Sequence, residues 1–169
     1  MILDSGARRE FDSGAVRDIQ EGKGRCDLLP LDVVGLLFKR AGKAEQCTML
    51  CRINDYVRYG EICGLLDAVI EFAAEQGIDI YTMVLEVAKH YEEGSKKYEE
   101  RNWEKGIPTH CFIDSAVRHL LKHWRGDTDE SHDRAFVWGM LGVIWTHFNH
   151  EKLNDLPHTT KLPEGRIKE

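Results

Sequence analysis

The sequence has little of what marks several classes of protein. Only four prolines and no low-complexity run occur in its 169 residues. No apolar stretch approaches the roughly 20 residues that a membrane-spanning helix needs. The opening residues, MILDSGARR, lack the apolar core of a signal peptide. We therefore expect a soluble protein of the cytoplasm that has no membrane partner.

The cysteines also exclude a disulfide framework. There are five of them, an odd number, and no CxxC pair occurs. Free thiols in a reducing compartment are the expected state. Cys47 and Cys51 lie four residues apart and could bind zinc together with Cys63, which is an alternative interpretation of these three.

What is present fits one globular domain. Hydrophobic residues make up 42% and charged residues 31% of the chain, which excludes a disordered segment. A formal net charge of −6 argues against bulk nucleic acid as a partner, because that usually requires a basic face. Small anionic ligands stay possible, since a local cationic pocket can exist in an acidic protein.

Apolar residues recur with helical spacing, and no segment predicts a convincing strand. Helices are expected over residues 31–42, 43–60 and 61–76, after Asp79 with an interruption at Gly94, from Thr109 to Arg125, and over 130–150. The last is apolar on most sides, as in a central bundle helix or an oligomer interface, so we expect a homo-oligomer. The predicted fold is all-α: a compact helical bundle (31–151) with an extended N-terminal arm (1–30) and a flexible C-terminal tail (152–169).

Carboxylates gather at the ends of the later helices. Hydrolysis of a phosphoanhydride needs a divalent cation, and Mg²⁺ prefers oxygen ligands from acidic side chains on facing helices. The expected ligands of Mg²⁺ or Mn²⁺ are Glu93, Asp129, Glu130 and Asp133, with Glu92 and Asp114 as further candidates. His119, His132 and Glu130 are the candidate catalytic residues, because an imidazole or carboxylate there can orient water. The alternative for each is an ordinary exposed acid or a core histidine.

Cations and rings form a second set of candidates. Lys23 and Arg25 alternate with glycines, so backbone and side chains can approach an anion together. Further cations surround a polar turn that holds two aromatic residues able to stack on a base. The residues expected to bind substrate are Lys23, Arg25, Lys97, Tyr98, Arg101, Asn102, Trp103, Lys105 and Arg118. A solvated charge run is the alternative.

Three ordered blocks resemble the phage-encoded dATP/dGTP diphosphohydrolase family, N-terminal domain type. The first comprises Ser13-Gly14-Ala15, Arg17-Asp18 and residues 22–30 (GKGRCDLLP). The second comprises Gly94, Lys97-Tyr98, Arg101-Asn102-Trp103 and Lys105-Gly106-Ile107. The third comprises Asp114-Ser115-Ala116, Arg118-His119-Leu120, Gly126-Asp127, Asp129-Glu130, His132 and Trp138. Glu92-Glu93 and Glu130-x-x-Asp133 are also distantly similar to the acidic pattern of the MazG-like all-α pyrophosphohydrolases.

The resemblance implies a small helical phage protein of the host cytoplasm that cleaves a purine dNTP to dNMP and pyrophosphate with Mg²⁺ or Mn²⁺. The leading hypothesis is therefore a metal-dependent nucleotide pyrophosphohydrolase. The alternative is a non-catalytic phage protein that binds and sequesters a nucleotide or a nucleotide-derived signal. A helical module that binds a protein partner is a third possibility.

Overall fold

The computed structural model describes residues 6–158, and contacts between them define two compact units. Among the described residues, the first unit comprises 6–28 and 73–155, and the second comprises 29–72 and 156–158. Six α-helices dominate the described residues, which confirms the all-α class. Within residues 6–158, no helix combines the length and the apolar character needed to cross a membrane. Residues 159–169 of the predicted tail lie outside the described part.

The second unit is built from α1 (Leu31–Arg40), α2 (Ala44–Tyr59) and most of α3 (Ile62–Glu75). Gly35 lets α1 approach α2 closely, since an added Cβ there would lie 3.3 Å from the Cys47 sulfur. The guanidinium of Arg52 on α2 contacts Glu71 on α3 at 2.8 Å. These three helices match the ranges that periodicity predicted.

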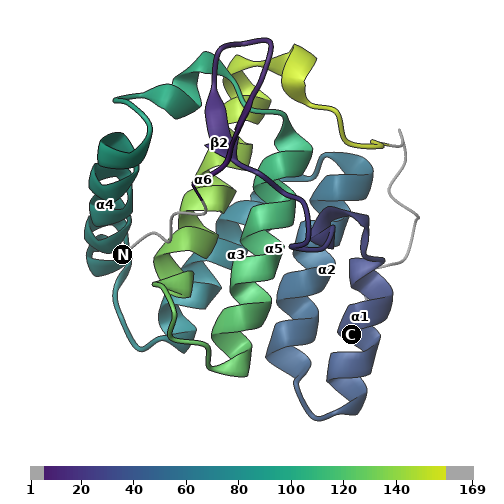
Figure 1. Ribbon diagram of the computed structural model, residues 1–169. Helices are drawn as coiled ribbons and strands as arrows, with labels where there is room; N and C mark the ends of the chain where they lie inside the picture. Colours follow the sequence, from purple (N-terminus) through teal and green to yellow (C-terminus); the bar gives the residue numbers. More distant parts are fainter. Residues whose placement is uncertain (1–5, 159–169) are drawn as a thin grey trace. The chain divides into compact units, whose positions relative to one another are not determined.

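The first unit contains α4 (Ile80–Lys97), α5 (Thr109–Arg125) and α6 (His132–Asn149), with short 3₁₀ turns at η2 (Asn102–Lys105) and η3 (Glu151–Leu153). Asp79 caps α4 by accepting a hydrogen bond from the Thr82 amide at 2.9 Å. The helix then continues through Gly94, where the sequence had predicted an interruption. Figure 1 shows α5 and α6 side by side, with α4 against α6.

The N-terminal segment contains two short strands that the sequence analysis missed. β1 (Arg8–Glu10) and β2 (Val16–Asp18) pair antiparallel, with Arg9 opposite Arg17. Three residues are too few to show an alternating pattern, so the strands are determined by contacts with distant residues. The Asn102 side chain accepts from the Val16 amide and donates to the Val16 carbonyl, each at 2.8 Å. The η1 turn (Cys26–Leu28) then packs against α5.

Two glycines of α6 determine how closely it approaches α5. A Cβ added at Gly142 would lie 2.4 Å from the Phe112 ring, and one at Gly139 would lie 2.7 Å from the Ala116 Cβ. Phe112 and Ala116 are fully buried. The absence of a side chain on α6 at these two positions therefore creates room for the side chains of α5.

We predict that Gly142→Ala lowers the free energy of unfolding by about 1–3 kcal/mol, because the buried Phe112 ring has no free space to move into. Gly94→Ala is the matched control on α4, where an added Cβ meets nothing within 4 Å. Alanine has the higher helix propensity, so this control should stabilise the protein by about 0.5–1 kcal/mol. Urea unfolding followed by circular dichroism measures both, and equal effects would contradict the close-approach argument.

Candidate functional site

A cavity of about 940 Å³ opens within the first unit. This volume is in the range that accommodates a drug-sized or nucleotide-sized ligand. Its cationic lining residues are Arg9, Arg17, Lys23, Arg101, Arg118 and Lys122. Its aromatic lining residues are Phe11, Tyr91, Tyr98, Trp103 and Trp138. The lining also holds carboxylates, those of Asp18, Glu92, Glu99, Glu100, Asp114 and Glu130. Charges of both signs and ring surface therefore share one hollow.

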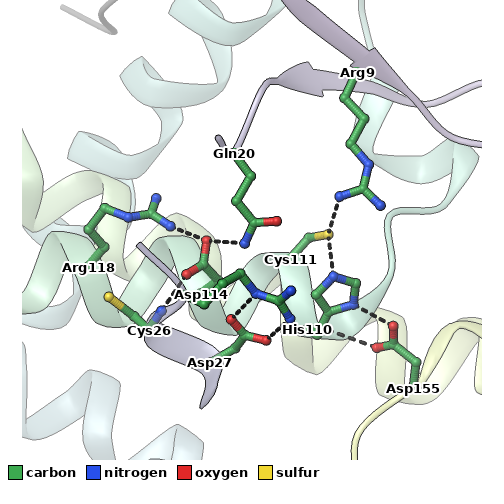
Figure 2. A network of polar contacts seen from close by, with 10 residues as sticks. Arg9, Gln20, Cys26, Asp27, His110, Cys111, Asp114, Arg118 and Asp155 are labelled. Carbon is green, nitrogen blue, oxygen red and sulfur yellow. Dashed lines mark hydrogen bonds and ion pairs between the residues drawn. The ribbon is translucent and has the colours of Figure 1, made fainter. Parts of the chain in front are cut away.

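A buried carboxylate attaches the N-terminal segment to α5 beside this cavity. Asp114 is only 3% exposed. It accepts hydrogen bonds from the Gln20 side chain at 2.8 Å and from the Cys26 amide at 2.7 Å, and it forms an ion pair with Arg118 (Figure 2). Arg118 in turn donates to the Lys23 carbonyl at 3.2 Å. Asp114 thus holds residues 20–26 in place as one wall of the cavity.

A second carboxylate, Asp18, binds residues of β1 and of the C-terminal end of α4. It pairs with Lys97 at 2.7 Å and with Arg8 at 3.1 Å, and the Tyr98 hydroxyl donates to it at 3.1 Å. Burial raises the pKa of Tyr98 to about 12, with the nearby Asp18 adding to the effect. Tyr98 is therefore a neutral hydrogen-bond donor at physiological pH, and Lys97 is engaged in a buried ion pair.

The two predicted catalytic histidines meet where α5 ends and α6 begins. His119 Nδ1 lies 2.9 Å from His132 Nδ1, and Glu130 Oε1 lies 3.5 Å and 3.7 Å from these two atoms. All three potential ligand atoms lie within 4.8 Å of one another. The sequence analysis named these residues as catalytic candidates, and the structure places them together as a possible cation site.

Neighbouring groups affect the ionisation of Asp129 and His119 in and around this cluster. Lys122 and His132 lower the pKa of Asp129 to about 2, so its carboxylate is ionised and accepts from His132 Nε2 at 2.7 Å. The other ring nitrogen of His132, Nδ1, faces His119 and Glu130. Burial, assisted by the nearby His132, lowers the pKa of His119 to about 3, so the His119 ring is neutral.

This donor set can hold a metal ion. Two imidazole nitrogens and one carboxylate suit a transition metal better than Mg²⁺, which prefers oxygen ligands throughout. Asp129 lies on the far nitrogen of His132, where a carboxylate typically orients a metal-binding histidine. Asp129 is thus placed to orient His132, and its carboxylate also forms a second group of potential ligand atoms with Asp127 and His132, again within 4.8 Å of one another.

The other predicted metal ligands lie apart from this cluster. Glu93 contacts Arg134 at 3.4 Å, and Arg134 also donates to Ser131. Asp133, in the first turn of α6, acts electrostatically on His123. Neither residue belongs to the groups of ligand atoms that converge in the described part of the chain.

The predicted substrate-binding residues divide into two sets. Lining the cavity are Lys23, Tyr98, Arg101, Asn102, Trp103 and Arg118. Both polar atoms of the Asn102 amide are occupied by Val16, however, and Arg101 pairs with Glu104 at 2.6 Å. The remaining three do not line the cavity, and each forms an ion pair: Arg25 with Asp27, Lys97 with Asp18, and Lys105 with Glu99.

Several lining residues were not identified as candidates from the sequence, among them Arg9, Arg17 and His90. Arg9 comes from β1. Arg17 comes from β2, where its guanidinium lies 5.4 Å and 5.3 Å from the ring centroids of Phe112 and Trp138. Burial lowers the pKa of Arg17 from its ordinary value. His90 on α4 is the third, and its buried Nδ1 has no hydrogen-bond partner. Arg17 belongs to a motif quoted above, which was the available signal, whereas Arg9 and His90 follow no recognisable pattern.

Residues 78–156 match the family model described as dATP/dGTP diphosphohydrolase, N-terminal. This match confirms the family resemblance. No curated protein and no solved structure matches the chain. The likeness to MazG-like enzymes stays a prediction.

The matched segment contains α4, α5 and α6, with His119, Glu130 and His132. Arg9, Arg17 and Lys23 precede it and line the same cavity. The cavity is thus assembled from the family segment and from N-terminal residues outside the match, which Asp114 connects.

We predict that Asp114→Asn releases residues 20–26 from α5. The substitution removes one charge of a buried ion pair, which costs about 2 kcal/mol or more. Hydrogen exchange at the Cys26 amide should accelerate at least about tenfold, as about 1.4 kcal/mol corresponds to tenfold. Asp127→Asn is the control, because Asp127 pairs with the exposed Arg125. Unchanged exchange at Cys26 in Asp114→Asn would show that other contacts hold the segment.

Proposed function

We propose that this protein is a metal-dependent pyrophosphohydrolase that cleaves a purine dNTP to dNMP and pyrophosphate. The observation that carries the proposal is the cavity of the first unit. Its lining combines cations, aromatic rings and two members of the imidazole–carboxylate cluster, His119 and Glu130. The family description supports the purine deoxynucleotide as the substrate class.

The triphosphate would lie toward Lys23, Arg118 and Lys122. Lys23 and Arg118 are adjacent through the bond to the Lys23 carbonyl, and Lys122 extends from the same helix as His119. Partial burial lowers the pKa of Lys23, and an arriving anion would stabilise its charged form. Arg118 and Lys122 also form ion pairs with Asp114 and Asp129, so Lys23 would contribute most to binding of the triphosphate.

His119, Glu130 and His132 would hold the metal, with Asp129 orienting His132. A divalent cation bound there neutralises charge that develops on the phosphate oxygens during hydrolysis. Glu130 would orient the water that attacks the α-phosphorus as the bond to pyrophosphate breaks. Because two of the three ligands are imidazoles, we expect Mn²⁺ to support more activity than Mg²⁺.

The base would occupy the aromatic part of the cavity. Tyr91 packs edge-on against Trp103 with ring centroids 5.6 Å apart, and the ring centroids of Trp138 and His90 lie 5.5 Å apart. Burial lowers the pKa of His90 to about 4, so the ring is neutral and carries one N–H. Adenine and guanine both present N7 as an acceptor. A single N–H from His90 could therefore recognise either purine.

The proposed activity is tested by incubating the protein with each dNTP and Mn²⁺ or Mg²⁺ and measuring pyrophosphate. Glu130→Gln should lower kcat by about a hundredfold or more, because a carboxylate that orients water contributes about that much. Glu100→Gln, at the exposed rim of the same cavity, should retain wild-type activity. No pyrophosphate from any nucleotide, with well-folded protein, would defeat the proposal.

The role of His90 is tested by His90→Phe, which keeps the ring and removes both nitrogens. Loss of one hydrogen bond to the base should raise the KM for dATP and dGTP by about tenfold. Pyrimidine nucleotides lack N7, so their KM should change little. An equal change for all four nucleotides would mean that His90 supports the cavity without reading the base.

A second candidate function is capture of a nucleotide without cleavage. The position of Glu93 favours it, because Arg134 engages this carboxylate and the convergent cluster then contains one carboxylate, Glu130. Recovery of intact nucleotide from a tight complex, unaffected by a chelator, would support capture. Phage origin, cytoplasmic location and a homo-oligomeric state stay predictions of the sequence.

A further inference from the structure

Three side chains form a continuous polar chain at the start of α5. Asp155 Oδ2 lies 2.5 Å from His110 Nδ1, and Asp155 Oδ1 accepts from the His110 amide at 3.0 Å. The other ring nitrogen, Nε2, lies 3.2 Å from the Cys111 sulfur. Figure 2 shows this order, carboxylate to imidazole to thiol, with Arg9 on the other side of the sulfur.

The sulfur faces two positive groups. Hydrogen bonding to Asp155, and secondly to Cys111, raises the pKa of His110 to about 10, so the imidazole is protonated at neutral pH and directs Nε2–H at the sulfur. Arg9 Nη1 lies 4.0 Å from the same atom. Arg17, bound to the Cys111 carbonyl at 3.1 Å, adds a third cation nearby. Burial opposes ionisation of a thiol, whereas adjacent cations stabilise the thiolate.

Small reagents can reach this sulfur through the cavity, because Cys111 and Arg9 both line it. The other cysteines have different surroundings. Burial raises the pKa of Cys26, and burial together with Cys47 raises the pKa of Cys51 to about 11. Cys63 is exposed and is the natural reference for an ordinary thiol. The chain therefore contains its own comparison set.

We propose that Cys111 is a nucleophilic thiolate and a site of reversible oxidation, activated by His110, Asp155 and Arg9. Its co-reactant is a hydroperoxide. The sulfur attacks the hydroxyl oxygen of the peroxide and the O–O bond breaks. The second oxygen leaves as alkoxide, or as hydroxide where the peroxide is hydrogen peroxide, and takes a proton from solvent. The sulfur loses two electrons to the peroxide and becomes a sulfenic acid, which a small thiol reduces again. The added oxygen lies at the wall of the cavity.

Alkylation across a pH series tests the nucleophile. Folded full-length protein is treated with iodoacetamide, and the rate at each cysteine is measured by peptide mass spectrometry. The rate at Cys63 should fall about tenfold for each pH unit below its ordinary thiol range. The rate at Cys111 should stay nearly level down to about pH 6, where it exceeds that at Cys63 by at least about tenfold. Parallel profiles, or no labelling of Cys111, would overturn the proposal.

Three variants test the activating groups. Asp155→Asn, His110→Gln and Arg9→Gln should each slow Cys111 alkylation at about pH 6 by roughly threefold to tenfold, with Cys63 unchanged. His147→Gln, on α6, is the control and should change neither rate. Arg9 is exposed, so its variant keeps the test valid if Asp155→Asn or His110→Gln fails to fold. Wild-type rates in folded His110→Gln and Arg9→Gln would refute the assigned roles.

Oxidation is tested with hydrogen peroxide and dimedone, which traps sulfenic acid. The adduct should form on Cys111 before Cys63, and a preference for Cys63 would overturn the oxidation step. This readout does not depend on nucleotide hydrolysis. If dimedone labels Cys111 while no nucleotide is cleaved, the proposed oxidation site is supported and the proposed function fails.

Discussion

The buried carboxylate of Asp114 is the interaction on which the site depends. A carboxylate that is removed from water needs partners for its oxygens. Here they are the Gln20 side chain, the Cys26 amide and the Arg118 guanidinium. Two of the three belong to a segment about ninety residues earlier in the chain. The N-terminal segment is therefore held against α5 because the buried Asp114 carboxylate needs these partners. Lys23, Arg9 of β1 and Arg17 of β2 belong to the same segment and line the cavity.

Ion pairs also decide which cations remain available to a ligand. Asp18 engages Lys97 and Arg8, and Asp27 engages Arg25. Lys23 instead lines the cavity as an exposed side chain. An anionic ligand gains least from cations that it must take from a carboxylate. The arrangement thus concentrates binding potential in a few of the many basic residues.

Helices and local clusters were predictable from the sequence, whereas the pairing of residues far apart in the chain was not. Apolar spacing gave α1 to α6 to within a few residues, because each helix buries one periodic face. His119 and His132 stood out because a short turn joins their helices. Glu93 was expected beside Glu130, but the structure pairs it with Arg134, a choice that depends on the angle between α4 and α6. The β1–β2 pairing depends likewise on Asn102, which lies some eighty-six residues from Val16.

The glycines at 139 and 142 would have a consequence for the proposed metal site. His119 and His132 stand on the two helices whose closest approach these glycines allow, so the gap between the imidazoles is inherited from the interaxial distance. Helix pairs separate by different amounts depending on the side chains at their contact. The spacing of the two helices would then select the cation by its radius. A packing change at least one helical turn away from any ligand could therefore alter which ion fits.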